Sequence, residues 1–99
     1  MNNLNQLIQS INEFRDARNW REYHNPKDLA VSISIEAAEL LEDFQWKNSE
    51  QALEDNMENI QEEIADVLIY TMMLSSDLDL DIEEIVTKKL EKNAEKYPT

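Results

Sequence analysis

Residues 60–70 read Ile-Gln-Glu-Glu-Ile-Ala-Asp-Val-Leu-Ile-Tyr and place two acids, Glu63 and Asp66, inside the most apolar part of the chain. Residues at positions i and i+3 of an α-helix lie about 60° apart around its axis, so these two carboxylates point to one side. A carboxylate with apolar neighbours is partly removed from water, which disfavours its charged form. The stretch therefore predicts a helix that carries a functional pair of acids on one face.

A second pair, Glu36 and Glu39, has the same spacing within residues 30–41, which are also largely apolar. Two such helices packed side by side would bring four carboxylates to one place, where they repel one another unless a cation neutralises them. Carboxylate oxygens are hard ligands that suit Mg²⁺, for which Mn²⁺ can substitute. Other acidic pairs at this spacing need only a solvated helix face as their explanation. The apolar neighbours of these two pairs favour a magnesium site, and with it a phosphate-bearing ligand.

The composition favours one all-α domain over residues 1–99. The chain has no glycine and two prolines, so tight turns with positive φ are scarce and β-hairpins are disfavoured. The net charge of −13 argues against binding a nucleic-acid polymer, although a bound cation still permits a nucleotide. The chain has no cysteine, no apolar run of membrane-spanning length and no visible signal peptide, so we expect a cytoplasmic protein without a membrane partner.

Apolar periodicity and capping signals predict four helices. Asn25 and Pro26 form a start signal for the second helix, and residues 81–84 form a capping box for the fourth. From Ile60 onward the third helix is apolar on almost every side, which three neighbouring helices can hardly cover. We therefore expect a second chain to pack there, in a dimer or tetramer. The predicted helices span about residues 3–18, 26 to 45 or 46, 54–76 and 81–96.

The fourth helix has a core stripe that turns basic towards its end. Lys89, then Lys92 and Asn93, then Lys96 recur at helical spacing on one side. Cations near a helix C-terminus are ordinary, because the macrodipole favours them there. The same residues could also bind phosphate oxygens that a metal does not cover.

Several polar aromatic residues lie in or near the connections between the predicted helices. Trp20, His24 and Trp46 are placed where a base could stack on them, although packing in a core is the commoner use of such residues. Tyr70 follows Asp66 by four residues and therefore shares the acidic side of the third helix.

The order of these motifs resembles the MazG-like all-α nucleoside triphosphate pyrophosphohydrolases. The signature is Glu36-x-x-Glu39 followed after 23 residues by Glu63-x-x-Asp66. It is joined by further blocks in the same order, at residues 18–29 (RNWREYHNPKDL), 44–46 (FQW), 62–70 (EEIADVLIY) and 92–98 (KNAEKYP). Within that family the chain is most similar to the small single-domain type that includes dCTP pyrophosphatases. Two positions depart from the usual pattern of the family: Asn19 stands where the family usually has Asp, and Asp28 stands where it usually has Asn.

The resemblance implies a four-helix fold, assembly into homodimers or homotetramers, and a role for each matched residue. The four acids of the signature would bind Mg²⁺. The base and sugar would be bound by Trp20, His24, Trp46, Tyr70 and Asn93, and the phosphates would face Lys89, Lys92 and Lys96.

The expected reaction is hydrolysis of a nucleoside triphosphate to the monophosphate and pyrophosphate in control of the nucleotide pool, and the expected substrate is dCTP or a related dNTP. Glu39 or Glu62 would orient or deprotonate the attacking water. Glu63 belongs to the catalytic group because loss of a metal ligand should abolish turnover. Two alternatives stay open. One is a pyrophosphohydrolase of another phosphorylated nucleotide, and the other is a non-catalytic acidic helical protein that binds a partner and holds a structural metal.

Overall fold

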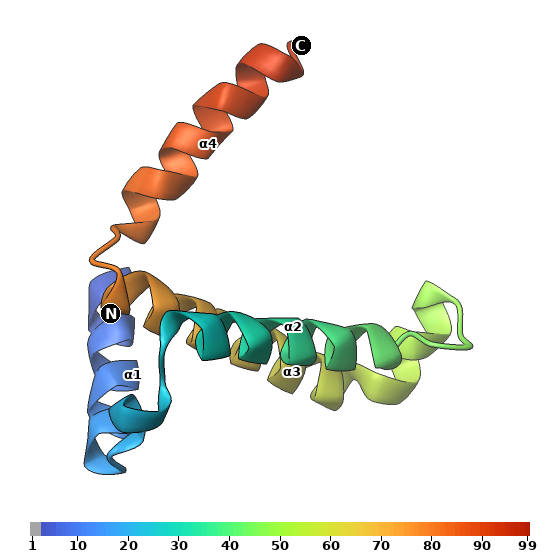
Figure 1. The fold of residues 1–99 in the computed structure, drawn as a ribbon. Coiled ribbons are helices and arrows are strands. Elements are labelled where there is room, and N and C mark those ends of the chain that lie inside the picture. Colours follow the sequence, from blue (N-terminus) through green and yellow to red (C-terminus); the bar gives the residue numbers. More distant parts are fainter. Residues whose placement is uncertain (1–2) are drawn as a thin grey trace.

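The computed structural model describes residues 3–99 of the protein and is all-α, with no strand among those residues (Figure 1). The predicted fold class is confirmed. A single 3₁₀ turn joins the first two helices. The elements are α1 (Leu4–Ala17), η1 (Trp20–Tyr23), α2 (Pro26–Glu42), α3 (Ser49–Asp77) and α4 (Ile82–Lys96).

Side-chain caps fix the starts of the helices. The Asn25 side chain accepts a hydrogen bond from Asp28 N at 2.8 Å, with Pro26 in the first turn of α2 as predicted. At α4, Asp81 Oδ1 accepts from Glu84 N at 3.0 Å. No return bond from the Glu84 side chain occurs in the described chain, so only half of the predicted capping box is formed.

The predicted boundaries between the second and third helices are wrong. The second helix ends at Glu42 rather than near residue 46, and the third begins at Ser49 rather than near residue 54. Asn48 caps this earlier start by accepting from Gln51 N at 2.9 Å. Within α3, Asn56 has non-helical φ and ψ of −124° and 19°, and its Nδ2 donates to the Asp43 carbonyl at 2.7 Å. This bond satisfies a carbonyl at the end of α2 and coincides with the kink in α3.

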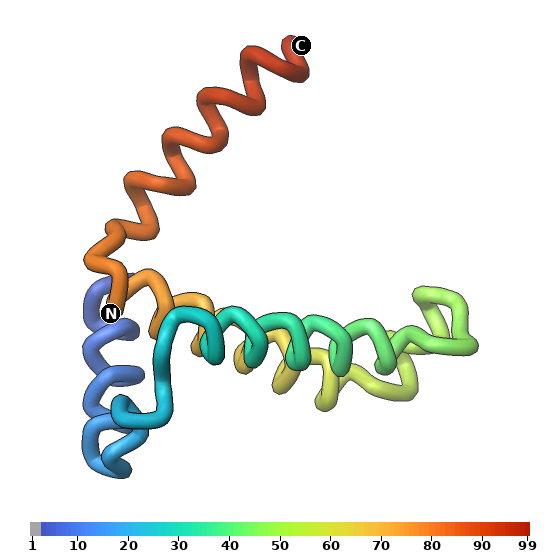
Figure 2. Tube along the Cα trace, in the orientation of Figure 1, coloured from blue at the N-terminus to red at the C-terminus, as the bar shows by residue number. Residues whose placement is uncertain are grey.

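The helices form a long pair with a shorter crossing helix at one end. α2 and α3 run antiparallel side by side, α1 crosses them at the end near the start of α2, and α4 projects away (Figures 1 and 2). The core lies where α1 meets this pair and is formed by Ile11, Leu29, Met72 and Met73. Six partly buried residues pack against it: Leu4, Ile8, Ile69, Tyr70, Leu74 and Ile82.

Much apolar surface stays uncovered in the single chain. Ile64 and Leu68 of α3 are 45% and 49% exposed, although they lie in the stretch that the sequence predicts to be covered all round. α4 also presents apolar side chains to solvent, among them Ile85, Val86 and Leu90. None of the helices within residues 3–99 is long and apolar enough to cross a lipid bilayer.

We expect Leu29→Ala to lower the free energy of unfolding by about 2–4 kcal/mol, because it opens a cavity in the core. Chemical denaturation followed by circular dichroism would measure this change. Leu41→Ala on the same helix is the matched control, since Leu41 is exposed in the single chain. Any loss in that variant should grow with protein concentration, because only a second chain could bury the side chain. A Leu29→Ala loss below about 0.5 kcal/mol would contradict the described core.

Candidate functional site

The pairing of α2 with α3 brings three of the four predicted acids together. One carboxylate oxygen from each of Glu36, Glu39 and Glu63 lies within 4.8 Å of the others. Glu36 and Glu39 are one turn apart on the face of α2 that packs on α3, and Glu63 meets them from α3. Asp66 lies one turn further along α3 and is not one of these three. It lines the neighbouring cavity, while its negative charge still raises the pKa of Glu36 and Glu63.

The electrostatics of this cluster favour an added positive charge. Burial, a hydrogen bond with Glu39 and the charges of Glu39, Asp66 and Glu63 raise the pKa of Glu36 to about 7. Burial and the contact with Glu39 also raise the pKa of Glu63. In addition, Glu36 Oε2 is buried and has no hydrogen-bond partner in the described chain. A hard divalent cation fits this donor set, because it would satisfy the unpaired oxygen and neutralise the mutual repulsion.

Asp43 is a further acid at this site that the sequence analysis missed. Its charge contributes to the raised pKa of Glu63, and its Oδ2 is buried without a hydrogen-bond partner among residues 3–99. Asp43 follows Glu39 by four residues and Glu36 by seven, so it continues the same helical face. That spacing is the signal that could have identified Asp43, but it lies outside the i, i+3 pairs from which the site was predicted.

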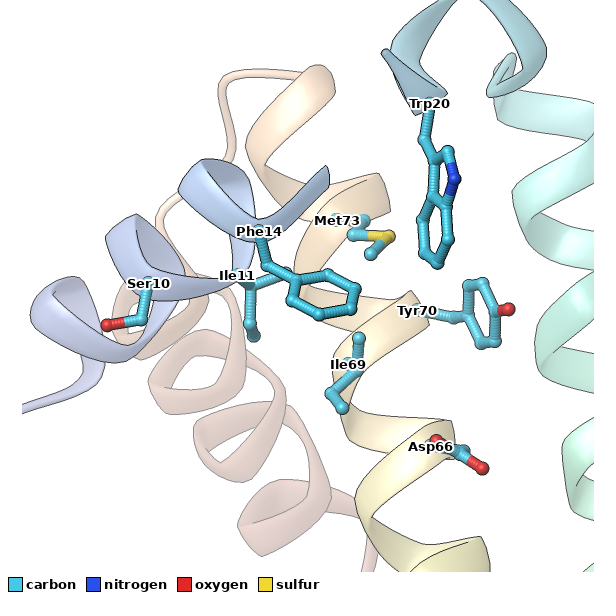
Figure 3. Close-up of a pocket in the computed structure, with 8 residues that line it drawn as sticks. All are labelled: Ser10, Ile11, Phe14, Trp20, Asp66, Ile69, Tyr70 and Met73. Carbon is cyan, nitrogen blue, oxygen red and sulfur yellow. The ribbon is translucent and has the colours of Figure 1, made fainter. Parts of the chain in front are cut away.

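A cavity of about 430 Å³ adjoins the acids (Figure 3). It is mainly apolar, and Figure 3 shows Trp20 reaching from η1 towards Tyr70 and Met73, with Asp66 one turn below Tyr70. Phe14 contacts Trp20 edge-on, with ring centroids 5.4 Å apart. Eight residues from α1, η1 and α3 line the cavity: Ser10, Ile11, Phe14, Trp20, Asp66, Ile69, Tyr70 and Met73.

Tyr70 connects the cavity to the acids. Burial and the negative charges of Glu36, Asp66 and Glu39 raise the pKa of its hydroxyl above the ordinary value of 10.0. The hydroxyl therefore stays protonated at neutral pH and can donate a hydrogen bond to a ligand. The predicted placement of Tyr70 on the acidic side of its helix agrees with this arrangement.

A backbone feature sets the position of Trp20. Asn19, the residue before η1, has a left-handed φ of 56°. Asn and Asp adopt this conformation more readily than other residues with a Cβ. Asn19 therefore suits this backbone as well as the Asp that the resembled family usually has at this position.

Several predicted site residues lie elsewhere in the single chain. Trp46 is 94% exposed, with a left-handed φ of 66°, in the turn between α2 and α3. This turn lies at the end of the helix pair away from α1 (Figure 1). Glu62 is exposed and is not one of the clustered acids. His24 contacts the edge of Trp20 but does not line the cavity. The projecting α4 holds the remaining four away from the cavity: Lys89, Lys92, Asn93 and Lys96.

Comparison with known proteins agrees with these features. The model of the MazG-like family matches residues 31–99. The dCTP pyrophosphatase 1 proteins of Mus musculus and Rattus norvegicus are 33% and 35% identical over 91 residues, which cover 87% of this chain and 54% of each relative. The chain thus spans about half the length of the curated relatives it matches. A pyrophosphatase from Archaeoglobus fulgidus, known from its crystal structure, is 48% identical in sequence to this chain. The two structures superpose with a TM-score of 0.93 over 100% of this chain and 95% of that one.

The raised pKa of Glu36 predicts that the metal-free protein loses stability as the pH rises. The folded state holds this proton up to about pH 7, whereas the unfolded chain releases it near 4.5. The contribution is therefore complete below pH 4.5 and is lost as the pH passes 7. At pH 8 we expect Glu36→Gln to be more stable than wild type by about 1–2 kcal/mol, with the difference vanishing near pH 4.5.

Thermal unfolding in EDTA from pH 4.5 to 8 would measure this difference. Glu58→Gln on an exposed part of α3 is the matched control and should follow the wild-type curve. Parallel curves for wild type and Glu36→Gln would show that Glu36 titrates normally.

Proposed function

The chain belongs to the MazG-like family, and on this basis we propose that it is a metal-dependent nucleoside triphosphate pyrophosphohydrolase. The proposed substrate is dCTP or a related dNTP, converted to the monophosphate and pyrophosphate, and the proposed role is control of the nucleotide pool. The observation that carries the proposal is the meeting of Glu36, Glu39 and Glu63 beside an aromatic-lined cavity. The names of the matched relatives support the reaction class.

We assign the metal to four side chains, Glu36, Glu39, Glu63 and Asp66, with Mg²⁺ as the ion and Mn²⁺ as its substitute. When bound, the ion supplies positive charge that polarises phosphate oxygens and offsets the charge developing on the leaving group. Asp43 lies close enough to Glu63 to influence its pKa, so it adds to the negative potential of the site without being one of the assigned ligands.

The residues of the chain bind the nucleotide and direct the water. Trp20 provides a flat face for the base, and the protonated Tyr70 hydroxyl donates to the sugar or base. The water oxygen forms a bond to the α-phosphorus as the bond to the bridging oxygen breaks and pyrophosphate leaves. The proton passes to a carboxylate, for which we propose Glu39, since one of its oxygens lies within 4.8 Å of those of both Glu36 and Glu63. Glu62 is the alternative base.

We further propose that the complete site needs a second copy of the chain. Trp46 and the α4 residues Lys89, Lys92, Asn93 and Lys96 are far from the cavity of their own chain but sit on exposed elements. The uncovered apolar side chains of α3 and α4 support an assembly through these helices, as a homodimer or a tetramer. In such an assembly the lysines face the phosphates and Trp46 contacts the base.

We expect pyrophosphate release from dNTPs with Mg²⁺ and none with EDTA. Glu63→Gln should lower kcat about 100-fold or more, because it weakens metal binding and the charge that stabilises the leaving group. A pyrophosphate-release assay over the dNTPs and NTPs measures both effects. Glu58→Gln is the control, because it removes an exposed acid of α3 that lies outside the cluster, and it should keep wild-type turnover. Near-wild-type turnover of a folded Glu63→Gln would contradict its assignment. No release from any triphosphate would favour another phosphorylated nucleotide or a non-catalytic role.

A mixture of two weak variants should recover activity if the site is shared between chains. Trp46→Ala should raise KM about tenfold, the effect of losing one stacked base contact. Co-refolding it with Glu63→Gln at equal amounts should give about a quarter of wild-type activity at low substrate, because half of the dimers are mixed and one of their two sites is intact. Glu36→Gln mixed with Glu63→Gln is the control and should stay inactive. No recovery in the first mixture would place Trp46 outside the partner's site.

A further inference from the structure

The most deeply buried charge of the chain is outside the acid cluster. Arg15 is 0% exposed in the last turn of α1, where the sequence shows only an amphipathic helix. Burying a guanidinium group costs several kcal/mol unless partners compensate for its lost hydration. A structure that keeps such a group has to satisfy its donors, so the identity of its partners is informative.

Three partners surround the guanidinium group. Both carboxylate oxygens of Asp77, at the end of α3, accept hydrogen bonds from it, one of them from Nη1 at 3.0 Å. Asn12 Oδ1 accepts from Nε at 3.0 Å. The third partner is His24, whose Nδ1 lies 3.4 Å from Nη1. Arg15 thereby joins α1 and α3 to the segment that follows η1.

The contact with Arg15 decides which nitrogen of His24 carries the proton. A guanidinium group only donates hydrogen bonds, so Nδ1 has to be the acceptor and the proton of the neutral ring resides on Nε2. Burial and the charge of Arg15 lower the pKa of His24 below its ordinary value of 6.5. Asp77 opposes this effect and Arg21 adds to it, so the charged groups around the ring leave it neutral at physiological pH.

His24 in turn contacts the wall of the cavity. Its ring lies edge-on to Trp20, with centroids 6.1 Å apart, and Trp20 lines the cavity. Nε2 has no hydrogen-bond partner within residues 3–99, and it is not among the buried unpaired atoms. The ring therefore offers a single donor, Nε2–H, beside the aromatic wall.

We propose that Arg15 is a positioning residue for nucleotide binding: it holds His24 as the neutral Nε2–H tautomer, so that His24 presents one fixed donor to a ligand acceptor beside Trp20. This inference rests on the proposed function, which supplies a ligand with such acceptors in the carbonyl oxygens and ring nitrogens of a nucleobase. Arg15 acts through His24. We assign it no contact with the phosphates or with the clustered acids Glu36, Glu39 and Glu63.

Nitrogen NMR of the imidazole in the metal-free protein without substrate tests the first part. We expect the Nε2–H tautomer alone from pH 6 to 8 and a His24 pKa below 6.5. In Arg15→Lys, whose shorter, unforked head cannot bridge Asp77 and His24, we expect mixed tautomers and a pKa nearer the ordinary value. A wild-type protein with the proton on Nδ1 would overturn the inference. This measurement needs no turnover, so it remains decisive even if no triphosphate is hydrolysed.

Steady-state kinetics test the second part. Arg15→Lys should raise KM about three- to tenfold, the value of one hydrogen bond, with kcat little changed. His24→Ala should have a similar effect, and the double variant should be no worse than His24→Ala alone, because Arg15 acts through the ring. Asp77→Asn is the control, since it weakens the ion pair and leaves the ring contact in place. If Arg15→Lys lowers Tm but changes neither the tautomer nor KM, Arg15 only joins α1 to α3.

Discussion

The packing of α2 against α3 forces like charges together, and the other features of the site depend on this contact. The two helices carry apolar residues that must leave water, and the same faces carry Glu36, Glu39 and Glu63. Hydrophobic burial is the dominant favourable term in folding, so it can hold the acids closer than their charges alone would allow. The result is a Glu36 with a pKa near 7 and an oxygen without a partner. A cation would relieve both, so the proposed metal site is a consequence of the packing.

The buried Arg15 is linked to the aromatic wall of the cavity through His24, which contacts Trp20. Arg15 and Asp77 join α1 to α3, and α1 and α3 together form most of the cavity wall. The clustered acids make one part of the proposed site negative. Arg15 orients the His24 ring, which lies against Trp20 in the aromatic part. A buried ion pair is weak support for stability on its own. Its contact with His24, which lies against Trp20, gives it a second use, which is to orient the ring beside the wall that a base would contact.

The single chain brings together the clustered acids and the aromatic wall of the proposed site, but the lysines that we assign to the phosphates lie on α4. That helix projects from the core with its apolar side chains in solvent, and Trp46 is equally exposed at the far end of the α2–α3 pair. Exposed apolar surface of this extent is typical of a chain that associates with another. The proposed assembly would cover that surface and would also bring the positive charges of the α4 lysines to the cavity of the partner chain.

The fold class and three of the clustered acids, Glu36, Glu39 and Glu63, could be predicted from the sequence alone. Absence of glycine, the 3.6-residue period and the caps at Asn25 and Asp81 are local properties, and they give helices whatever the rest of the chain does. The spacing of the acidic pairs is likewise local. The packed helices were needed to show that Asp43 lies close to Glu63, that α3 kinks at Asn56 beside the end of α2, and that Arg15 is buried. Helical spacing places Asp43 on the face of Glu36 and Glu39, but these contacts join residues distant in sequence, and no period or motif reports which side chains of different helices will meet.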